Sequence, residues 1–359
     1  KKNLGRWNRI AQIAQEYRKM LRIREDNEPI DAEEVGHLIA LAYPERIAHA
    51  TDHTGNFKMS NGNTIFIDPC DSMAANEWLA IASLNLASTS SSNPAQRRKG
   101  RVFLSAPVNW KNLPAQTCEN ISWDSKALAV KMQQETRIGA LIIDSKPIQN
   151  ANRETVSDII CEAARKDGLS MFDWNESVHR LQQRVAQVAE WHPELEIPDL
   201  STEHLLTTAR AWLPFYLEEG GKMKTSVTEL KKLNLCEILW NILPYDLQQE
   251  IDRLAPTHIR VPSGSNIRID YRLGAEAPVL SVRLQECFGM TSTPTVDAGR
   301  QPLLLELLSP GFKPVQLTQD LASFWQGTYF EVRKELKRRY PKHFWPENPL
   351  ESQAVRGVK

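Results

Sequence analysis

Aromatic and basic side chains lie close together in two short stretches of the N-terminal half. Phe57-Lys58 precedes an asparagine–glycine turn, and a basic run after residue 96 follows a loop rich in serine. Aromatic rings can stack on the bases of a single-stranded nucleic acid while cations contact its phosphates. These stretches predict nucleic-acid contacts at Phe57, Lys58, Arg97, Arg98, Lys99 and Arg101. Taken singly, each cation is also typical of an ordinary solvated surface.

A third set of cations lies near the C-terminus. Tyr329, Val332, Leu336 and Tyr340 recur at helical spacing, which predicts a helix with one apolar face. The cations outside that face, and one just beyond the helix, are Arg333, Lys334, Lys337, Arg338, Arg339 and Lys342. Such a helix could bind nucleic acid, dock on a protein, or form ordinary solvated surface.

Both ends of this helix carry local signals. Thr328 with Glu331 predicts a capping box, in which each side chain accepts a hydrogen bond from a backbone N–H at the helix start. Pro341 is expected to end the helix, because proline has no N–H and clashes with the preceding turn.

A predicted β-hairpin adds one more candidate. Residues 257–261 and 266–271 read as strands that flank Ser263-Gly264-Ser265. Side chains alternate between the two faces of a strand, so Arg260 and Arg268 are expected to project from this hairpin. We include Arg268 among the nucleic-acid-binding candidates.

The Gly220-Gly221-Lys222 sequence invites comparison with a phosphate-binding loop. That loop needs a further glycine, separated from its Gly-Lys pair by four residues, and a serine or threonine directly after the lysine. Tyr216 and Met223 stand at those places, so the motif is absent. The GxSxG, HExxH, GxGxxG and DExH-type patterns are missing too. We therefore expect no catalytic residues, metal or cofactor in this chain.

Composition narrows the class of protein. A length of 359 residues suggests roughly two to three domains, and the net charge of zero means that any nucleic-acid binding must use local patches. The five cysteines never have CxxC spacing, which fits a reducing cytoplasm. No apolar run approaches the ~18 residues that span a membrane. The chain opens at Lys1, directly in a helical pattern, so we expect a piece of a longer protein.

Hydrophobic periodicity predicts a multidomain α+β chain. The predicted parts are a helical segment in residues 1–52, a small OB-like β-barrel in 53–148, a helical region in 149–254 and a C-terminal mixed α/β domain in 255–359. Helical spacing covers residues 3–24, and Asp31 is expected to cap a second helix.

Short strands support the barrel. Asn61-Gly62 between two apolar runs predicts a hairpin. Further strands are predicted at residues 78–82, 101–105, 127–132 and 138–143. This spacing is typical of a small barrel, although a plain antiparallel sandwich has the same periodicity.

Several blocks of sequence, taken in order, resemble one family. They are Leu41-Ala42-Tyr43-Pro44-Glu45-Arg46-Ile47-Ala48, Val261-Pro262-Ser263-Gly264-Ser265, Pro278 to Gly289, Leu307-Leu308-Ser309-Pro310, Pro314 to Leu321 and Tyr329 to Pro346. The chain resembles the C-terminal half of the HrpB family of bacterial DEAH-box ATP-dependent helicases. The last hundred residues carry the most specific part of this resemblance.

The resemblance implies a parent enzyme that hydrolyses ATP with magnesium on two RecA-like domains and moves or remodels RNA. It also implies that the ATPase motifs lie upstream of Lys1, so this chain alone should be catalytically silent.

Two functions are compatible with the sequence. The first is an accessory region that binds RNA or another single-stranded nucleic acid beside the motor. The second is an interaction module that docks on the parent's own RecA-like domains or on an acidic partner.

Overall fold

The computed structural model describes residues 4–25, 28–52, 55–85, 100–272 and 274–358. The chain divides into two units. The N-terminal unit comprises residues 1–120 and 132–149, and the C-terminal unit comprises residues 121–131 and 150–359. Helices and several sheets are both present, so the predicted mixed α+β class is confirmed.

Two helices open the N-terminal unit. Helix α1 (Leu4–Met20) is followed by α2 (Ala32–Ala42), and Asp31 caps α2 as predicted by accepting a hydrogen bond from the Glu33 N–H at 2.9 Å. Gly36 lets α2 approach the barrel closely, because a Cβ at this position would lie 1.8 Å from the Pro107 carbonyl oxygen. Helix α2 therefore packs on the barrel through a backbone surface.

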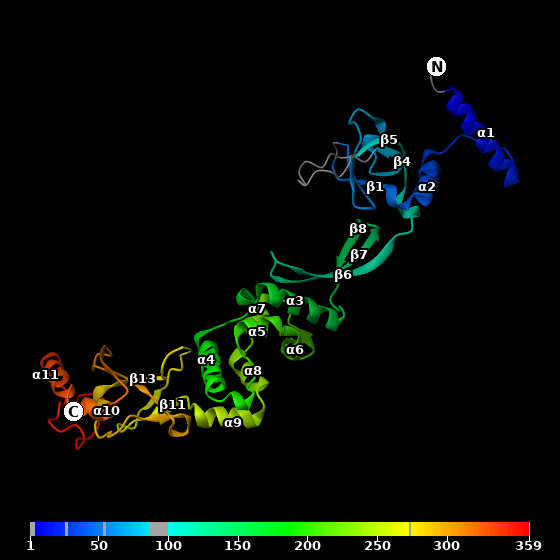
Figure 1. The fold of residues 1–359 in the computed structure, drawn as a ribbon. Coiled ribbons are helices and arrows are strands. Elements are labelled where there is room, and N and C mark those ends of the chain that lie inside the picture. Colours follow the sequence, from blue (N-terminus) through cyan, green and yellow to red (C-terminus); the bar gives the residue numbers. More distant parts are fainter. Residues whose placement is uncertain (1–3, 26–27, 53–54, 86–99, 273, 359) are drawn as a thin grey trace. The chain divides into compact units, whose positions relative to one another are not determined.

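Five strands of this unit close into a barrel, which excludes the sandwich alternative. The strand order is β1-β2-β3-β5-β4; β3 and β5 are parallel and the other neighbours are antiparallel. The strands are β1 (Ile47–Ala50), β2 (Asn56–Met59), β3 (Thr64–Phe66), β4 (Trp78–Asn85) and β5 (Gly100–Pro107). Figure 1 shows α2 beside this barrel. The Asn61-Gly62 hairpin is formed, between β2 and β3.

Hydrophobic residues fill the barrel and cover one side of it. The interior holds Ala48, Phe57, Met59, Ile65, Ile67, Leu79 and Ile81. A second cluster joins α2 to the outside of the barrel and to the following hairpin, through Ala40, Ile47, Trp78, Ala80, Val108, Leu113, Ile138 and Leu141. Burial of this apolar surface is the main force that closes the barrel.

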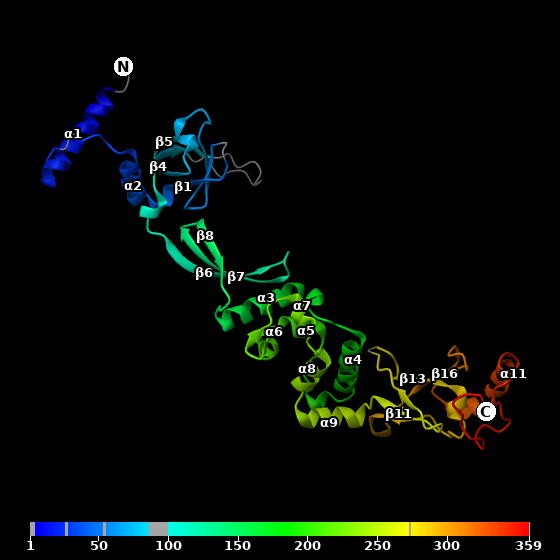
Figure 2. The same cartoon turned by 180° about the vertical axis from the view of Figure 1, so that it is seen from behind.

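A three-stranded sheet follows, in the order β6-β7-β8. Its strands are β6 (Gln116–Asp124), β7 (Ala129–Ile138) and β8 (Leu141–Pro147), seen from behind in Figure 2. The strand predicted at residues 138–143 is wrong. Gly139, at φ +56°, and Ala140 form a tight turn between β7 and β8, and the Ala140 N–H donates to the Ser60 carbonyl at 2.7 Å. A continuous apolar run concealed this turn.

Helices dominate the next part of the C-terminal unit. They are α3 (Arg153–Met171), α4 (Glu176–Trp191), α5 (Thr202–Thr207), α6 (Ala209–Trp212), α7 (Val227–Leu230), α8 (Leu235–Ile242) and α9 (Tyr245–Leu254). Within the predicted helical region, residues 202–216 and 227–254 each form several short helices. Pro214 and Pro244 contribute to these breaks, because proline fixes φ and has no N–H to donate.

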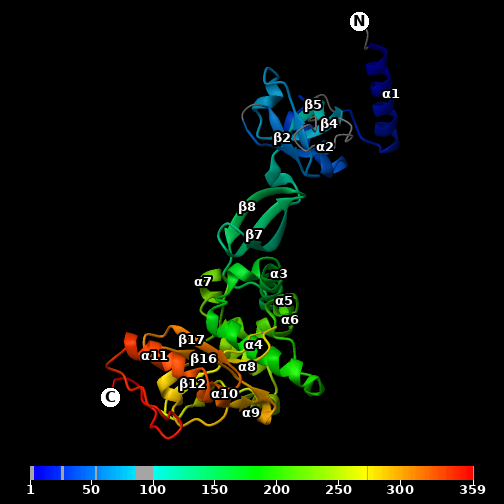
Figure 3. The ribbon, with the colours of Figure 1, turned by 60° about the vertical axis from the view of Figure 1, so that its left-hand side comes forward.

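The C-terminal residues form a mixed fold around the sheet β13-β16-β17. Strand β13 runs parallel to β16, and β17 runs antiparallel to it. The elements are β11 (His258–Arg260), β12 (Asn266–Arg268), β13 (Val279–Arg283), β14 (Thr295–Val296), β15 (Gln301–Pro302), β16 (Leu304–Leu308), β17 (Pro314–Thr318), α10 (Leu321–Gln326) and α11 (Tyr329–Arg339). Figure 3 shows α10 and α11 beside this sheet.

Candidate nucleic-acid interface

The outer face of strands β2, β3 and β5 brings cations and aromatic rings together. Ile65 and Val102 point into the barrel, so Phe66 and Arg101 on the same two strands point outward, and they are paired in register. Phe103 lies two residues after Arg101, at a bulge in the pairing of β5 with β4, and is 63% exposed. Lys58 is exposed on β2. We call Lys58, Phe66, Arg101 and Phe103 the barrel face.

Phe57 is not part of this face, which corrects the expectation that its ring stacks on a base. Its side chain is fully buried inside the barrel. The prediction placed both members of Phe57-Lys58 on the surface, but adjacent residues of a strand point in opposite directions. Burial of the phenyl ring therefore leaves only the lysine available. The candidates Arg97, Arg98 and Lys99 lie outside the described residues.

Sequence reasoning missed Phe66 and Phe103. Arg101-Val102-Phe103 reads polar, apolar, apolar, so the residue types alone did not mark Phe103 as outward-facing. An alternating pattern would in any case not show which of the two sets of side chains faces the core. The choice between the two faces was made only by the packing of Val102 against the barrel core.

Helix α11 has the predicted length and apolar residues. Tyr329 and Leu336 are buried, while Val332 and Tyr340 are half-buried. The Tyr329 ring contacts a cluster formed by Phe288, Phe324, Trp325 and Phe330. Its hydroxyl donates to the Pro346 carbonyl at 2.8 Å, and burial raises the pKa of this hydroxyl. The apolar face thus holds both the helix and the tail that follows it.

Arg333 is hydrogen-bonded to the same tail, which corrects its assignment as a nucleic-acid contact. The Arg333 Nε donates to the Trp345 carbonyl at 3.0 Å, and Nη2 lies 3.3 Å from a Glu347 carboxylate oxygen. The side chain is only 20% exposed. Its guanidinium closes the loop between α11 and the C-terminal tail rather than facing a ligand.

The other cations of α11 face solvent. Lys334, Lys337, Arg338 and Lys342 are exposed, and no ion pair involving them occurs in the part of the chain that the structure describes. The predicted capping box is not formed, because Thr328 has helical backbone angles and its side chain makes no capping hydrogen bond. The helix start therefore depends on the buried Tyr329 rather than on a cap.

Arg268 is exposed on β12, directly opposite His258 of β11, as the hairpin prediction required. It lines a cavity of about 260 Å³ beside helix α4. The turn that closes this hairpin is fixed by Glu286, whose carboxylate accepts a hydrogen bond from the Ser263 hydroxyl at 2.7 Å.

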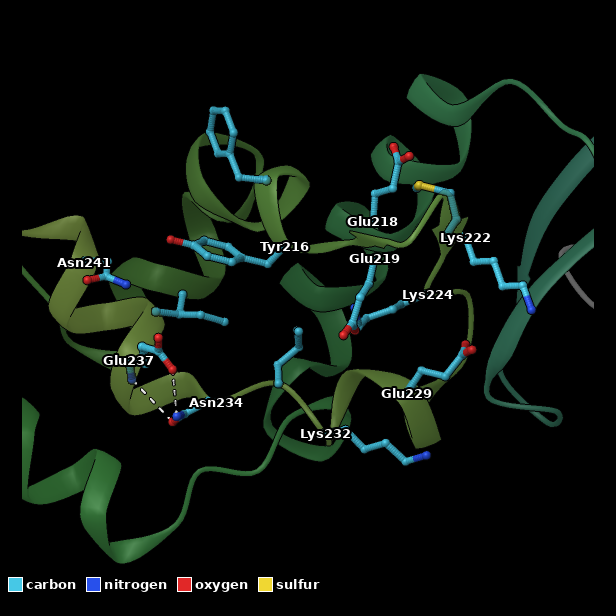
Figure 4. A pocket seen from close by; sticks show the side chains of 14 residues that line it. Tyr216, Glu218, Glu219, Lys222, Lys224, Glu229, Lys232, Asn234, Glu237 and Asn241 are labelled. Atoms are coloured by element: carbon cyan, nitrogen blue, oxygen red, sulfur yellow. Dashed lines mark hydrogen bonds and ion pairs between the residues drawn. The ribbon is translucent and has the colours of Figure 1, made fainter.

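A larger cavity of about 570 Å³ lies among the short helices and strands of residues 215–241, and Figure 4 shows its lining. Three lysines and four glutamates line it, but the carboxylates have local partners. Glu218 pairs with Arg153 at 2.7 Å and Glu219 with Lys224 at 2.7 Å. Glu229 accepts hydrogen bonds from the backbone and hydroxyl at Ser226, and Glu237 from the Asn234 amide. This cavity offers no pair of free acid and base groups.

The Gly220-Gly221 pair beside this cavity is a hairpin turn. It joins β9 (Glu218–Glu219) to β10 (Lys222–Met223), and both glycines have positive φ, at +58° and +80°. A two-residue hairpin of type I′ requires that geometry, which explains the glycines without any phosphate. The rejection of a phosphate loop at this site agrees with the structure.

One buried cluster of charged groups links α4 to the segment after β14. His192 is almost fully buried; its ring nitrogens lie 2.6 Å from Asp297 and 2.7 Å from Glu194. The hydrogen bond to Asp297, followed by that to Glu194, raises the pKa of the His192 imidazole. Arg300 lies 3.2 Å from the same ring. Because its charged groups are paired with one another, we regard the cluster as a structural junction.

Within the described residues, no group of three His, Cys, Asp or Glu side chains is arranged to hold a metal ion. None of the helices there has the length and apolar character that crossing a membrane requires.

Comparison with known proteins shows which proteins this chain resembles. A family model described as the C-terminal part of an ATP-dependent helicase matches residues 212–349. The ATP-dependent RNA helicase HrpB of Escherichia coli K12 is 33% identical over 354 residues, which are 97% of this chain and 42% of HrpB. This chain is a relative of the C-terminal part of HrpB.

Structure supports the same relationship. A crystal structure of the E. coli DExH-box NTPase HrpB matches with a TM-score of 0.55 and 32% identity, over 97% of this chain and 42% of that one. The resemblance predicted from sequence is therefore confirmed. The chain spans less than half the length of the HrpB proteins that it matches.

Proposed function

We propose that this chain is an accessory region of an HrpB-like ATP-dependent RNA helicase and binds single-stranded RNA through the barrel face. The observation that carries the proposal is the outward set Lys58, Phe66, Arg101 and Phe103 on adjacent strands. Two rings provide stacking surfaces and two cations provide phosphate contacts, which is the combination that binds single strands without sequence preference.

The architecture of the barrel supports this proposal. A five-stranded barrel whose strand 3 neighbours strand 5 has the connectivity of the OB-fold, and the order β1-β2-β3-β5-β4 has that feature. OB-folds bind oligonucleotides on the face of strands 2 and 3, which are the strands that hold Lys58 and Phe66. We assign the barrel to this class as part of the proposal.

The motor chemistry would lie elsewhere in the longer protein. This sequence has neither a phosphate-binding loop nor an acidic helicase box. We propose that ATP and magnesium bind to RecA-like domains outside this chain, and that this chain contributes RNA binding rather than ATP turnover.

The test is binding of a short single-stranded RNA to the whole chain, measured by fluorescence anisotropy at several salt concentrations. We expect wild-type affinity to fall with salt, by roughly 0.7 in log–log slope for each phosphate contacted. Arg101→Glu combined with Phe103→Ala should weaken binding at least about tenfold. A matched control is Phe215→Ala, which removes a ring that is 80% exposed in the C-terminal unit. Equal affinity of wild type and the double variant would exclude the barrel face.

A second candidate function is docking on the rest of an HrpB-like protein, and helix α1 favours it. Trp7, Ile10 and Tyr17 are each more than half exposed along that helix. Exposed apolar stripes of this kind commonly mark interaction surfaces. The partner would be the RecA-like domains that the longer relatives are proposed to contain.

Docking can be tested separately from RNA binding. Trp7→Asp with Tyr17→Asp should abolish association with a separately produced motor region, while the RNA affinity of the chain alone stays unchanged. Undiminished association of this variant in a pull-down would contradict the docking role.

A further inference from the structure

A small cavity in the C-terminal unit is lined by an unusual set of charges. It has a volume of about 260 Å³ and lies between helix α4 and the hairpin of β11 and β12. Its charged lining consists of Arg180, Arg184, Arg268 and Asp270, with His258 beside them. Three arginines and one aspartate thus contribute to the lining. The cavity of Figure 4 differs in this respect, since four carboxylates line it with three lysines.

The single carboxylate in this cavity is already neutralised. Arg272, which does not line the cavity, donates from Nε to the Asp270 carboxylate at 2.7 Å and from Nη2 at the same distance. Asp270 is therefore not available to pair with an arginine of the lining. Because Arg180 pairs with Glu176 and Arg184 with Asp252, the positive charge that stays without an ion pair among the described residues is that of Arg268.

The three arginines differ in how far the fold uses them. Arg184 is buried, donates to the Ala255 carbonyl at 2.6 Å and pairs with Asp252, so it is a fixed part of the wall. Arg180 pairs on the surface with Glu176, one turn earlier in α4. Arg268 is exposed and makes no ion pair or hydrogen bond in the described part of the chain. Arg268 is the group most free to meet a ligand.

The rest of the wall suits a phosphate group. Hydroxyls of Ser177 and Thr257 line the cavity, as does the His258 ring. Ser177 also lies in the first turn of the 16-residue helix α4, where the helix dipole favours negative charge. Arginine binds phosphate particularly well, because its planar guanidinium can donate two parallel hydrogen bonds.

We propose that this cavity is a phosphate-binding site in which Arg268 is the principal ligand-contacting residue. The phosphate could belong to an RNA backbone or to a free phosphate monoester, and the chemistry of recognition is the same. The site lies in a different unit from the barrel face. It therefore stands whether or not the barrel binds RNA.

The experiment is calorimetric titration of the whole chain at low ionic strength with three probes. These are inorganic phosphate, a nucleoside 5′-monophosphate and a short single-stranded RNA without terminal phosphates. Arg268→Ala should weaken, by about tenfold, the binding of inorganic phosphate and of any probe that inorganic phosphate displaces, whereas RNA bound at the barrel face should be unaffected. Arg268→Lys should recover part of the affinity, because lysine restores the positive charge but not the two parallel hydrogen bonds of a guanidinium.

Arg260→Ala is the matched control. Arg260 is exposed on the same face of the same hairpin, two residues from His258, but does not line the cavity. Its loss should leave the affinity unchanged. The barrel variant Arg101→Glu with Phe103→Ala should likewise keep full affinity for inorganic phosphate, so that failure of one proposal does not imply failure of the other.

The three probes identify the source of the phosphate. Binding of RNA that inorganic phosphate displaces, and that Arg268→Ala weakens, would assign the site to the nucleic-acid backbone. Binding of the monophosphate and inorganic phosphate alone would assign it to a monoester. Absence of binding by all three probes, or equal binding by wild type and Arg268→Ala, would overturn the proposal.

Discussion

The barrel face and helix α11 have similar compositions but use them differently. Each combines aromatic and basic residues within a few positions of the sequence. On the barrel face, Phe103 and Arg101 point outward from a strand whose other side fills the core. On α11, Tyr329 is buried and Arg333 is bonded to the tail. A ring or a charge is available to a ligand only where the fold does not already use it.

The largest expected effect is at Tyr329. Tyr329→Ala removes a fully buried ring and its hydrogen bond to Pro346, and should lower the free energy of unfolding by about 3–5 kcal/mol. Urea unfolding measures this loss. Phe330→Ala, which removes a neighbouring ring that is 49% exposed, should cost far less. Similar losses in the two variants would show that α11 does not use its rings as described.

The second effect is at Phe103, where we expect a loss of RNA binding without a loss of stability, in contrast to Tyr329. Phe103→Ala should leave the free energy of unfolding nearly unchanged, since the ring is exposed. The same variant should lose about 1–3 kcal/mol of binding to single-stranded RNA if one base stacks there. Unfolding and anisotropy measurements on one preparation test both halves, and a destabilised variant with normal RNA affinity would reverse the comparison.

Arg333 and Lys337 provide the sharpest test within α11 itself. Arg333→Ala breaks hydrogen bonds to the tail and should reduce stability by about 1 kcal/mol, with RNA affinity unaffected. Lys337→Ala should leave stability unchanged, because that side chain is exposed. Any effect of Lys337 should appear only in binding. Loss of RNA affinity in the Arg333 variant at full stability would restore Arg333 as a ligand contact.

The next prediction concerns His192 and the dependence of the free energy of unfolding on pH. Hydrogen bonds to Asp297 and Glu194 raise the folded-state pKa of the imidazole above its value in the unfolded chain, while Arg300 lies nearby. Glu250 and Arg253 of α9 also interact electrostatically with this cluster. Because protonation favours the folded state, the stabilisation is complete below the unfolded pKa of about 6.5 and is lost as pH rises through the raised folded pKa.

The pH prediction is checked by urea unfolding across that range. The wild type should lose stability as pH rises, and His192→Gln should flatten this dependence. His204→Gln, which changes an exposed histidine, is the control. A wild-type curve that rises with pH over the same interval would contradict the sign derived from the cluster.

The last prediction is the absence of a measurable activity. The chain alone should show no ATP hydrolysis above background, with or without RNA, because its sequence has no phosphate-binding loop. A phosphate-release assay with magnesium measures this directly, and steady turnover by the purified chain would contradict the proposed absence of a motor.

The sequence predicted much of the architecture through local rules. Asn61-Gly62 specified its hairpin, Asp31 capped α2 and Pro341 followed the end of α11, because each depends on the backbone preferences of neighbouring residues. The resemblance to HrpB was found from blocks of sequence in the correct order, and comparison confirmed it. The predicted domain boundaries stay predictions, although the barrel's first strand begins at Ile47.

Predictions from neighbouring residues were wrong at two places where the structure has tertiary contacts that the local sequence does not show. Thr328 and Glu331 have the spacing of a capping box, yet packing of Tyr329 gave Thr328 helical backbone angles instead. The turn at Gly139 and Ala140 lies inside an apolar run, and the Ala140 N–H bonds to the carbonyl of Ser60, in the distant turn between β2 and β3.

The sequence by itself determined the resemblance to the C-terminal part of HrpB, the mixed class and the residue types able to bind a nucleic acid. Tertiary structure alone decided which of those residues can do so. Phe57 is buried in the core and Phe103 is exposed, although each lies near a cation in the sequence: Phe57 directly precedes Lys58, and one residue separates Phe103 from Arg101. The physical reason is that strand alternation has a phase, and only burial of one face against a closed barrel fixes it.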